Sequence, residues 1–238
     1  MKPDYRNWVP KYILYLLGFF AALCCLAAMI LQWTLHDGTT KAILSSVLLV
    51  AGILLTAAFL WMARMYRAFS YDGKRKLSKD IVEGIAGYVK VPENGLALDV
   101  GCGSGALTIA VAKRNPSALV IGVDRWGKEY ASYNKSLCEK NAKAEGVHRV
   151  EFREGDAVQL DFPDESFDAV VSNYVYHNIT GVDRQQVLLE TLRVLKKGGS
   201  FALHDIFSKG KYGDMPSFVN KLKGMPKAQI TCLDYSPD

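Results

Sequence analysis

The residues best suited to ligand chemistry lie between residues 97 and 105, with the sequence Ala-Leu-Asp-Val-Gly-Cys-Gly-Ser-Gly. An apolar stretch ends in a carboxylate, Asp99, and leads into a turn with glycine at every second position. Glycine lets the backbone turn sharply and lets a ligand lie against bare main chain, and the helix start that follows offers unpaired N–H groups. This pattern predicts a nucleotide-type pocket at the carboxyl end of a first parallel strand.

The glycines alone do not decide which nucleotide binds. From Gly101 the sequence Gly-Cys-Gly-Ser-Gly-Ala also satisfies the dinucleotide fingerprint. Asp99 would repel the diphosphate of NAD, whereas it would suit an ammonium group such as that of S-adenosylmethionine. Asp124 ends a second apolar stretch about twenty residues further on, where a ribose-binding carboxylate is expected. A nicotinamide dehydrogenase is therefore the less favoured alternative.

Over residues 75–206 the chain resembles the class I S-adenosylmethionine-dependent methyltransferases. Five motifs carry the resemblance because they follow one another in the order typical of that family. They are the glycine turn, Gly-Val-Asp124, Glu-Gly-Asp156-Ala157, Phe-Pro-Asp-Glu-Ser-Phe-Asp-Ala-Val-Val-Ser-Asn173 and Leu-Arg-Val-Leu-Lys-Lys-Gly-Gly199. One such motif would be weak, but the ordered series is specific.

The resemblance implies S-adenosylmethionine as co-substrate and a role for each matching residue. Gly101 and Gly103 would lie behind the methionine portion, with Asp99 at its amino group. Asp124 would bind the ribose hydroxyls, and residues 156–157 would border the adenine. The residues implied to contact the cofactor are Asp99, Gly101, Cys102, Gly103, Gly105, Asp124, Arg125, Asp156, Ala157 and Asn173.

A general base is needed only if the methyl acceptor must lose a proton before it reacts. Candidates follow the fourth predicted strand, in Ser-Asn-Tyr-Val-Tyr-His-Asn178, which we expect at the carboxyl edge of the sheet. His177 is the preferred base because imidazole titrates near neutrality, and a purely structural histidine is the alternative. His204 and Asp205 are second choices. The segment lacks the Pro-Pro-Tyr motif of amino-group methyltransferases and looks more like enzymes that act on small molecules and lipid precursors.

Two long apolar stretches lie in the first 65 residues. Residues 12–33 and 42–63 carry no charged side chain. Each is long enough, at about 1.5 Å per residue, to cross a hydrocarbon layer of roughly 30 Å. A cleaved signal peptide is disfavoured by the length and by the second stretch, and a buried hairpin of a soluble protein rarely lacks charge over such a length. We therefore expect a transmembrane helical hairpin.

Basic residues flank the predicted hairpin at both of its ends. Lys2, Arg6 and Lys11 precede it and six basic residues follow it between 64 and 79, whereas the connecting loop holds only Lys41. Both termini and the catalytic domain are therefore expected on the cytoplasmic side of the cytoplasmic membrane. The basic cluster is either this topology signal or a means of holding the domain near anionic headgroups. Nucleic-acid binding is not expected, because the charge does not cover a soluble face.

The rest of the chain alternates apolar strands with helical segments, which predicts an α/β fold with a Rossmann-like, doubly wound, mostly parallel sheet. We expect a membrane hairpin in residues 1–65, a linker with an amphipathic helix in 66–92 and the cofactor-binding domain in 93–238. The expected strands are 96–100, 118–123, 149–153, 167–172 and 200–206, and the expected helices are 105–114, 126–144, 183–196 and 215–223, with helix C-caps at Gly146 and Gly198. A sixth strand is expected at 228–235 and no seventh is visible, so the domain is either shortened or a truncated piece.

These expectations combine into a membrane-anchored methyltransferase with a lipophilic small-molecule acceptor and the lipid bilayer as partners. The motivation is the anchor, because a water-soluble acceptor gives no reason for one. The alternatives are methylation of a membrane protein or a soluble metabolite, and a non-catalytic module that binds the nucleotide. The five cysteines show no metal-ligand spacing, so no metal is expected.

Overall fold

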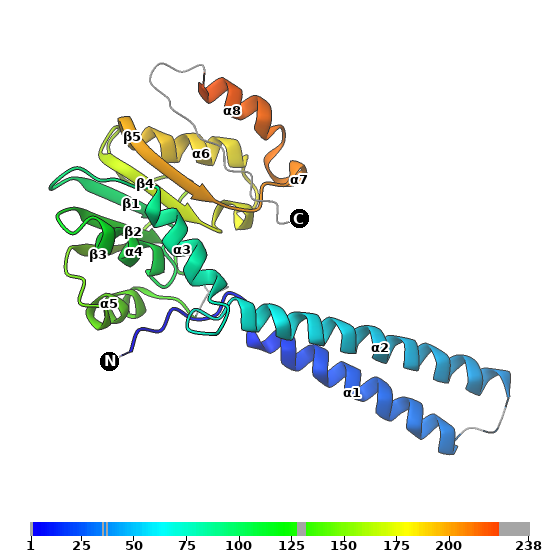
Figure 1. Ribbon diagram of the computed structural model, residues 1–238. Coiled ribbons are helices and arrows are strands. Elements are labelled where there is room, and N and C mark those ends of the chain that lie inside the picture. The colour runs from blue at the N-terminus through cyan, green and yellow to red at the C-terminus, as the bar shows by residue number, and fades with distance from the viewer. Residues whose placement is uncertain (1, 35, 37, 128–131, 224–238) are drawn as a thin grey trace. The chain divides into compact units, whose positions relative to one another are not determined.

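The structure is a computed structural model that describes residues 2–34, 36, 38–127 and 132–223. The chain divides into two compact units, one formed by Arg6–Asp80 and the other by Met1–Tyr5 together with Ile81–Asp238. The larger unit is thus built from two separate pieces of the chain, and the elements of both units are labelled in Figure 1.

The smaller unit contains two long apolar helices, α1 (Lys11–Thr34) and α2 (Thr39–Ala68), which lie side by side (Figure 1). They approach closely at small residues, since a Cβ added to Gly52 would lie 3.5 Å from Cys24 and 3.6 Å from Cys25. By length and composition, both helices are able to cross a membrane. Most of their large apolar side chains are exposed, as Trp33 is at 92%. The core helix of a soluble domain would bury such side chains.

The larger unit contains a five-stranded sheet in the order β3-β2-β1-β4-β5, with every neighbouring pair parallel (Figure 1). The α/β, doubly wound fold expected from the sequence is confirmed. The strands are β1 (Leu96–Val100), β2 (Leu119–Asp124), β3 (Val150–Glu154), β4 (Phe167–Asn173) and β5 (Leu195–His204). The helices are α3 (Leu77–Gly87), α4 (Ala106–Arg114), α5 (Lys135–Ala144), α6 (Arg184–Arg193), α7 (Lys209–Tyr212) and α8 (Met215–Lys223), with a 3₁₀ turn, η2 (Tyr176–Asn178).

Both faces of the sheet are covered, which explains why its central strands are continuous apolar runs rather than alternating ones. Leu98 and Val100 of β1 share one core cluster with Val187 of α6 and Phe218 of α8. The intervening residue, Asp99, points to the opposite face, where it contacts α4. The sheet therefore separates α4 from α6, and the carboxyl ends of its parallel strands share one edge.

The structure differs from the sequence-based expectation at the start of β5 and at the start of α5. The register between β4 and β5 shifts, because Phe167 pairs with Leu195 whereas Ala169 pairs with Ser200. Gly198, with φ +80°, lies in this irregularity, so its expected role as a helix C-cap is wrong. Helix α5 begins only at Lys135, and the strand expected over 228–235 lies outside the described residues.

Asp168, in β4, links the first residues of β1, β4 and β5. Its Oδ2 accepts a hydrogen bond from the backbone N–H of Leu96 and its Oδ1 accepts one from Nζ of Lys196, each at 2.8 Å. Burial alone would raise the pKa of this carboxyl, but the two donors outweigh burial and hold the pKa below its usual range. The ionised form of Asp168 is therefore the one that stabilises the fold.

We expect Asp168→Asn to lower the free energy of unfolding by about 1–3 kcal/mol near neutral pH, because the amide has one acceptor oxygen and leaves one of the two donors unpaired. The native pKa lies below the unfolded value of 3.8, so the contribution is complete above that value and is lost as the pH falls through the native pKa. Urea unfolding near neutral pH and in acid measures it. The control is Glu165→Gln, which removes the exposed ion pair with Lys197 and should change little. Equal losses in both variants would contradict the assignment.

Candidate cofactor and active site

The glycine turn after β1 is held against the end of β2. The N–H of Gly101, at φ +75°, donates to the carbonyl of Val123 at 2.8 Å. A Cβ at Gly101 would lie 2.2 Å from Val175, whereas a Cβ at Gly103, at φ +54°, would meet nothing within 4 Å. Gly101 is therefore required by the packing of the chain on itself, and Gly103 leaves open space at its Cα for a ligand.

The remaining residues of the turn face inward. Gly105, at φ +79°, begins α4, and a Cβ there would lie 3.0 Å from the ring of Phe152. The thiol of Cys138 donates to the carbonyl of Gly103 at 3.1 Å. Cys102 is buried, and burial raises the pKa of its thiol. The thiol of Cys102 is thus part of the wall behind the turn, so its expected contact with a ligand would use the backbone.

Asp124, at the end of β2, ties the turn to the following loop. Its two oxygens accept hydrogen bonds from the N–H groups of Gly103 at 2.8 Å and Trp126 at 2.7 Å. Each carboxylate oxygen keeps a second lone pair, so the group can still accept from ribose hydroxyls. Nε1 of Trp126 donates to the carbonyl of Gly103 at 3.0 Å. Arg125, between Asp124 and Trp126 in the sequence, is exposed. Trp126 was not predicted, because the Gly-Val-Asp124 motif gives no sign of a hydrogen bond from the loop after β2 to the turn after β1.

Asp99 lies behind the turn rather than at its open side. It is 1% exposed, and its Oδ2 accepts a 2.6 Å hydrogen bond from the hydroxyl of Thr108. Burial raises the pKa of this carboxyl to about 7. The repulsion of a diphosphate is therefore weaker than the sequence suggests, and any attraction for an ammonium group acts through charge from behind the turn. Direct contact with a ligand stays a prediction.

The two predicted adenine neighbours follow β3. Asp156 is exposed, and its Oδ1 accepts a hydrogen bond from the N–H of Val158 at 2.9 Å. Ala157 is half-buried beside it. This geometry is that of a strand-end turn, one of the two roles that an aspartate takes in such a place. A contact of either residue with adenine stays a prediction.

The predicted base and its two alternatives come together at the ends of β4 and β5. Nδ1 of His177 lies 2.5 Å from Oδ1 of Asp205, and Asp205 Oδ2 accepts the N–H of Tyr176 at 2.9 Å. The side chain of Asp205 is fully buried and that of His177 is 12% exposed. Because the carboxylate orients Nδ1 as the donor, Nε2 is left as a proton acceptor. This pair, which we call the His–Asp dyad, has the form of a general base.

Three further side chains, those of Asn173, Tyr174 and His204, lie on the β4–β5 side of the dyad. Asn173 Oδ1 lies 3.0 Å from Nδ1 of His204. The ring of Tyr174 stands edge-on to both His177 and His204. Burial lowers the pKa of His204 and raises that of Tyr174, so both rings are uncharged near neutrality. Asn173 is thus placed beside the dyad, and its expected contact with the cofactor stays a prediction.

The start of α6 holds the dyad in place. Nε of Arg184 donates to the carbonyl of Tyr176 at 3.0 Å, and its Nη1 donates to that of Lys211 at 3.0 Å. Nζ of Lys211 in turn donates to the carbonyl of His177 at 3.0 Å. Arg184 was not singled out from the sequence, because its acceptors include a carbonyl 27 residues away. It acts as a positioning residue for η2.

An apolar surface follows the dyad directly. Ile206 and Phe207, the two residues after Asp205, are 52% and 45% exposed. The hydroxyl of Tyr212 is buried close to Asp205. Burial, the charge of Asp205 and a hydrogen bond with its carboxylate raise the pKa of Tyr212, so the hydroxyl keeps its proton.

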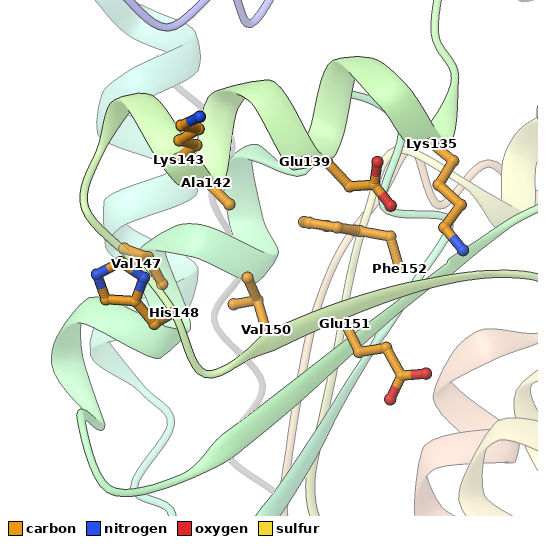
Figure 2. A pocket seen from close by; sticks show the side chains of 9 residues that line it. All are labelled: Lys135, Glu139, Ala142, Lys143, Val147, His148, Val150, Glu151 and Phe152. Carbon is orange, nitrogen blue, oxygen red and sulfur yellow. The ribbon is translucent and has the colours of Figure 1, made fainter.

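Two surface hollows lie apart from these groups. One, of 310 Å³, lies between α5 and β3 and is lined by Lys135, Phe152 and seven others (Figure 2). The second, of 440 Å³, lies along α6. Neither includes a residue of the predicted site. In the part of the chain that the structure describes, no cluster of three or more His, Cys, Asp or Glu could hold a metal, and metal-free chemistry stays a prediction.

The parallel sheet with a glycine turn after β1 and an acid after β2 defines a nucleotide-binding fold of the doubly wound type. Residues 98–203 match the family model of a methyltransferase domain, and this part of the chain is a domain of the class I S-adenosylmethionine-dependent type. The turn and Asp124 fit this cofactor, because open space beside Gly103 lies next to a carboxylate that can still accept hydroxyl groups.

Demethylmenaquinone methyltransferases are among the curated relatives. The enzyme of Lactobacillus johnsonii is 38% identical over 116 residues, which is 48% of this chain and 45% of that protein. The enzyme of Geobacillus stearothermophilus is 35% identical over 137 residues, which is 57% of this chain and 54% of that protein. The chain thus spans about half the length of the curated relatives it matches. The YcgJ protein of Bacillus subtilis is 30% identical, with a TM-score of 0.46 over 60% of this chain and 58% of that one, a likeness too loose to bear on function.

Gly101 and Gly103 should respond differently to the same substitution. We expect Gly101→Ala to lower the free energy of unfolding by about 2–5 kcal/mol, because its Cβ would overlap Val175. Gly103→Ala should cost only about 1–2 kcal/mol of backbone strain but should weaken binding of S-adenosylhomocysteine, because its Cβ points into open space. Chemical unfolding and calorimetric binding measure both. If Gly103→Ala bound S-adenosylhomocysteine as tightly as wild type, the cofactor would not lie against this side of Gly103.

Asp99 should make donor binding depend on pH. Since its pKa is raised to about 7, Asp99 is neutral below that pH and charged above it. A cationic ligand favours the charged form, so the affinity for S-adenosylmethionine should rise between about pH 6 and pH 8. Asp99→Asn should abolish this rise, whereas Asp80→Asn, at an exposed position of α3, should keep it. Parallel pH profiles for wild type and Asp99→Asn would show that the carboxylate does not sense the ligand.

Proposed function

We propose that the protein transfers a methyl group from S-adenosylmethionine to a lipophilic, hydroxyl-bearing acceptor of the class of reduced quinones, drawn from the membrane. The single observation that carries the proposal is the His–Asp dyad beside the exposed Ile206 and Phe207. A base would serve no purpose for an acceptor without an acidic proton, and an apolar wall would not favour a strongly hydrated one.

The relatives support the acceptor class. Two of them are named for demethylmenaquinone, a quinone with a long apolar chain. A quinone carbonyl has no proton to lose, whereas the reduced form carries hydroxyl groups on an electron-rich ring. The dyad therefore favours the reduced form as the reacting species, and an apolar chain would suit Ile206 and Phe207.

The two apolar helices support delivery from a bilayer. Both α1 and α2 meet the length and composition of a membrane span, and their large apolar side chains are exposed. The small residues between them, such as Gly52, suit helix pairing in lipid. With six basic residues between 64 and 79 and only Lys41 in the loop, both termini and the catalytic domain belong on the cytoplasmic side.

The chain's own residues have three tasks in the reaction. When bound, the donor supplies a methyl group on a positively charged sulfur, which keeps the bonding electron pair. Nε2 of His177 takes the proton of the acceptor hydroxyl, and Asp205 stabilises the imidazolium that forms. The ring carbon that gains the methyl group releases its own proton to solvent. The imidazolium of His177 then returns its proton to the acceptor oxygen, so the quinol and the base are restored and the charges balance.

The acceptor is tested with full-length protein in detergent and labelled S-adenosylmethionine. A membrane lipid extract and a prenylated demethylnaphthoquinone, in oxidised and reduced forms, are offered separately. We expect label in the lipid fraction and in the reduced quinone only. Label in soluble metabolites alone would reject a lipid acceptor, and donor binding without turnover on any extract would favour a non-catalytic module.

Substitutions in the dyad should separate chemistry from donor binding. We expect His177→Gln to lower kcat by about 100-fold or more while the KM for S-adenosylmethionine stays nearly constant, because the base acts only on the acceptor. Asp205→Asn should lower kcat as well. His148→Gln changes an exposed histidine next to β3 and is the matched control. Near-normal turnover by His177→Gln would remove the dyad from the mechanism.

A further inference from the structure

The segment that precedes α1 lies on the unit that holds the glycine turn. The N–H of Asp4 donates to Oδ1 of Asn141 at 2.7 Å, and Nδ2 of Asn141 donates back to the carbonyl of Asp4 at 2.9 Å. The Asn141 amide thus pairs with the backbone of Asp4 as a neighbouring strand would. Asn141 belongs to α5 and is 2% exposed, so the amide end of both bonds is buried.

The same amide holds the glycine turn. Nδ2 of Asn141 also donates to the carbonyl of Ser104 at 3.0 Å. Ser104 stands between Gly103 and Gly105 and is 6% exposed. One buried side chain therefore joins the N-terminal segment, α5 and the turn.

A second attachment lies one residue further along. Tyr5 is 5% exposed, and its hydroxyl donates to Oε1 of Glu145 at 3.1 Å. Glu145 also forms an ion pair with Lys113, at the end of α4. Chain ends are usually poorly ordered unless they are tied down, and here two consecutive residues are tied to α5.

We infer that Asp4 and Asn141 are positioning residues for the cofactor site, in which the N-terminal segment fixes the Asn141 amide and the amide fixes Ser104 in the glycine turn. The inference rests on the proposed function, because it concerns the same cofactor site. Without the N–H of Asp4, the amide loses the bond at its oxygen and keeps only those made by Nδ2, so the turn that carries Gly103 is held less firmly.

The test compares two substitutions at one position in the full-length protein. Asp4→Pro removes the N–H that Asn141 accepts, whereas Asp4→Ala keeps it. We expect Asp4→Pro to raise the dissociation constant of S-adenosylhomocysteine about three- to tenfold, the effect of one buried hydrogen bond. Asp4→Ala should bind more tightly than Asp4→Pro, because both variants lose the same side chain and only Asp4→Ala keeps the N–H. At saturating donor, kcat of Asp4→Pro should be unchanged, since only the KM for the donor is affected.

Hydrogen–deuterium exchange separates this role from general stability. In Asp4→Pro the amides of residues 103–107 should exchange faster, while those of β5 should not change. Tyr5→Phe, which loses the bond to Glu145 and keeps the Asp4 N–H, is the milder variant and should give a smaller loss of the same kind. Equal affinity and equal exchange in Asp4→Pro and Asp4→Ala would overturn the inference and leave the proposed function intact. A wild-type protein that does not bind S-adenosylhomocysteine would overturn both.

Discussion

The attachment of the glycine turn to the end of β2 is the constraint on which the rest of the site depends. The carbonyl of Val123 and the carboxylate of Asp124 together accept N–H groups from the turn. These bonds form only if β1 and β2 are parallel neighbours, so the cofactor face exists only after the sheet has paired. A change that loosens β2 would therefore disturb ligand binding before it unfolds the domain.

The base depends on a different pair of strands. His177 follows β4 and Asp205 follows β5, so the dyad assembles where these two parallel strands end. The register shift between Phe167 and Ala169 lies at the opposite end of this pair. The irregular part of the β4–β5 pair is thus far from the dyad. The regular part of the pair sets the distance between His177 and Asp205.

Much of the fold and part of the site follow from sequence patterns, because these features are local. The expected strand 96–100 and helix 215–223 match the structure, since apolar runs and helical spacing lie within a few residues of one another. His177 was found because it follows a strand that ends at the active edge. Trp126, Arg184 and Asn141 could not be found, because each acts through a backbone carbonyl far away in the chain, and such a partner leaves no mark on the sequence. Gly198 was misassigned for the related reason that a strand irregularity and a helix end both require positive φ.

The contact between Asp4 and Asn141 spans 137 residues. During synthesis, the segment that carries Asp4 leaves the ribosome before α5, so its contact with Asn141 cannot form until α5 has been made. The two apolar helices emerge in between, so they have to be accommodated while the future binding partner of the N-terminus does not yet exist. The closing of this long-range contact is therefore a late event in the maturation of the protein. Newly made chains would pass through a stage in which the helices are already in place but the donor pocket is still loose.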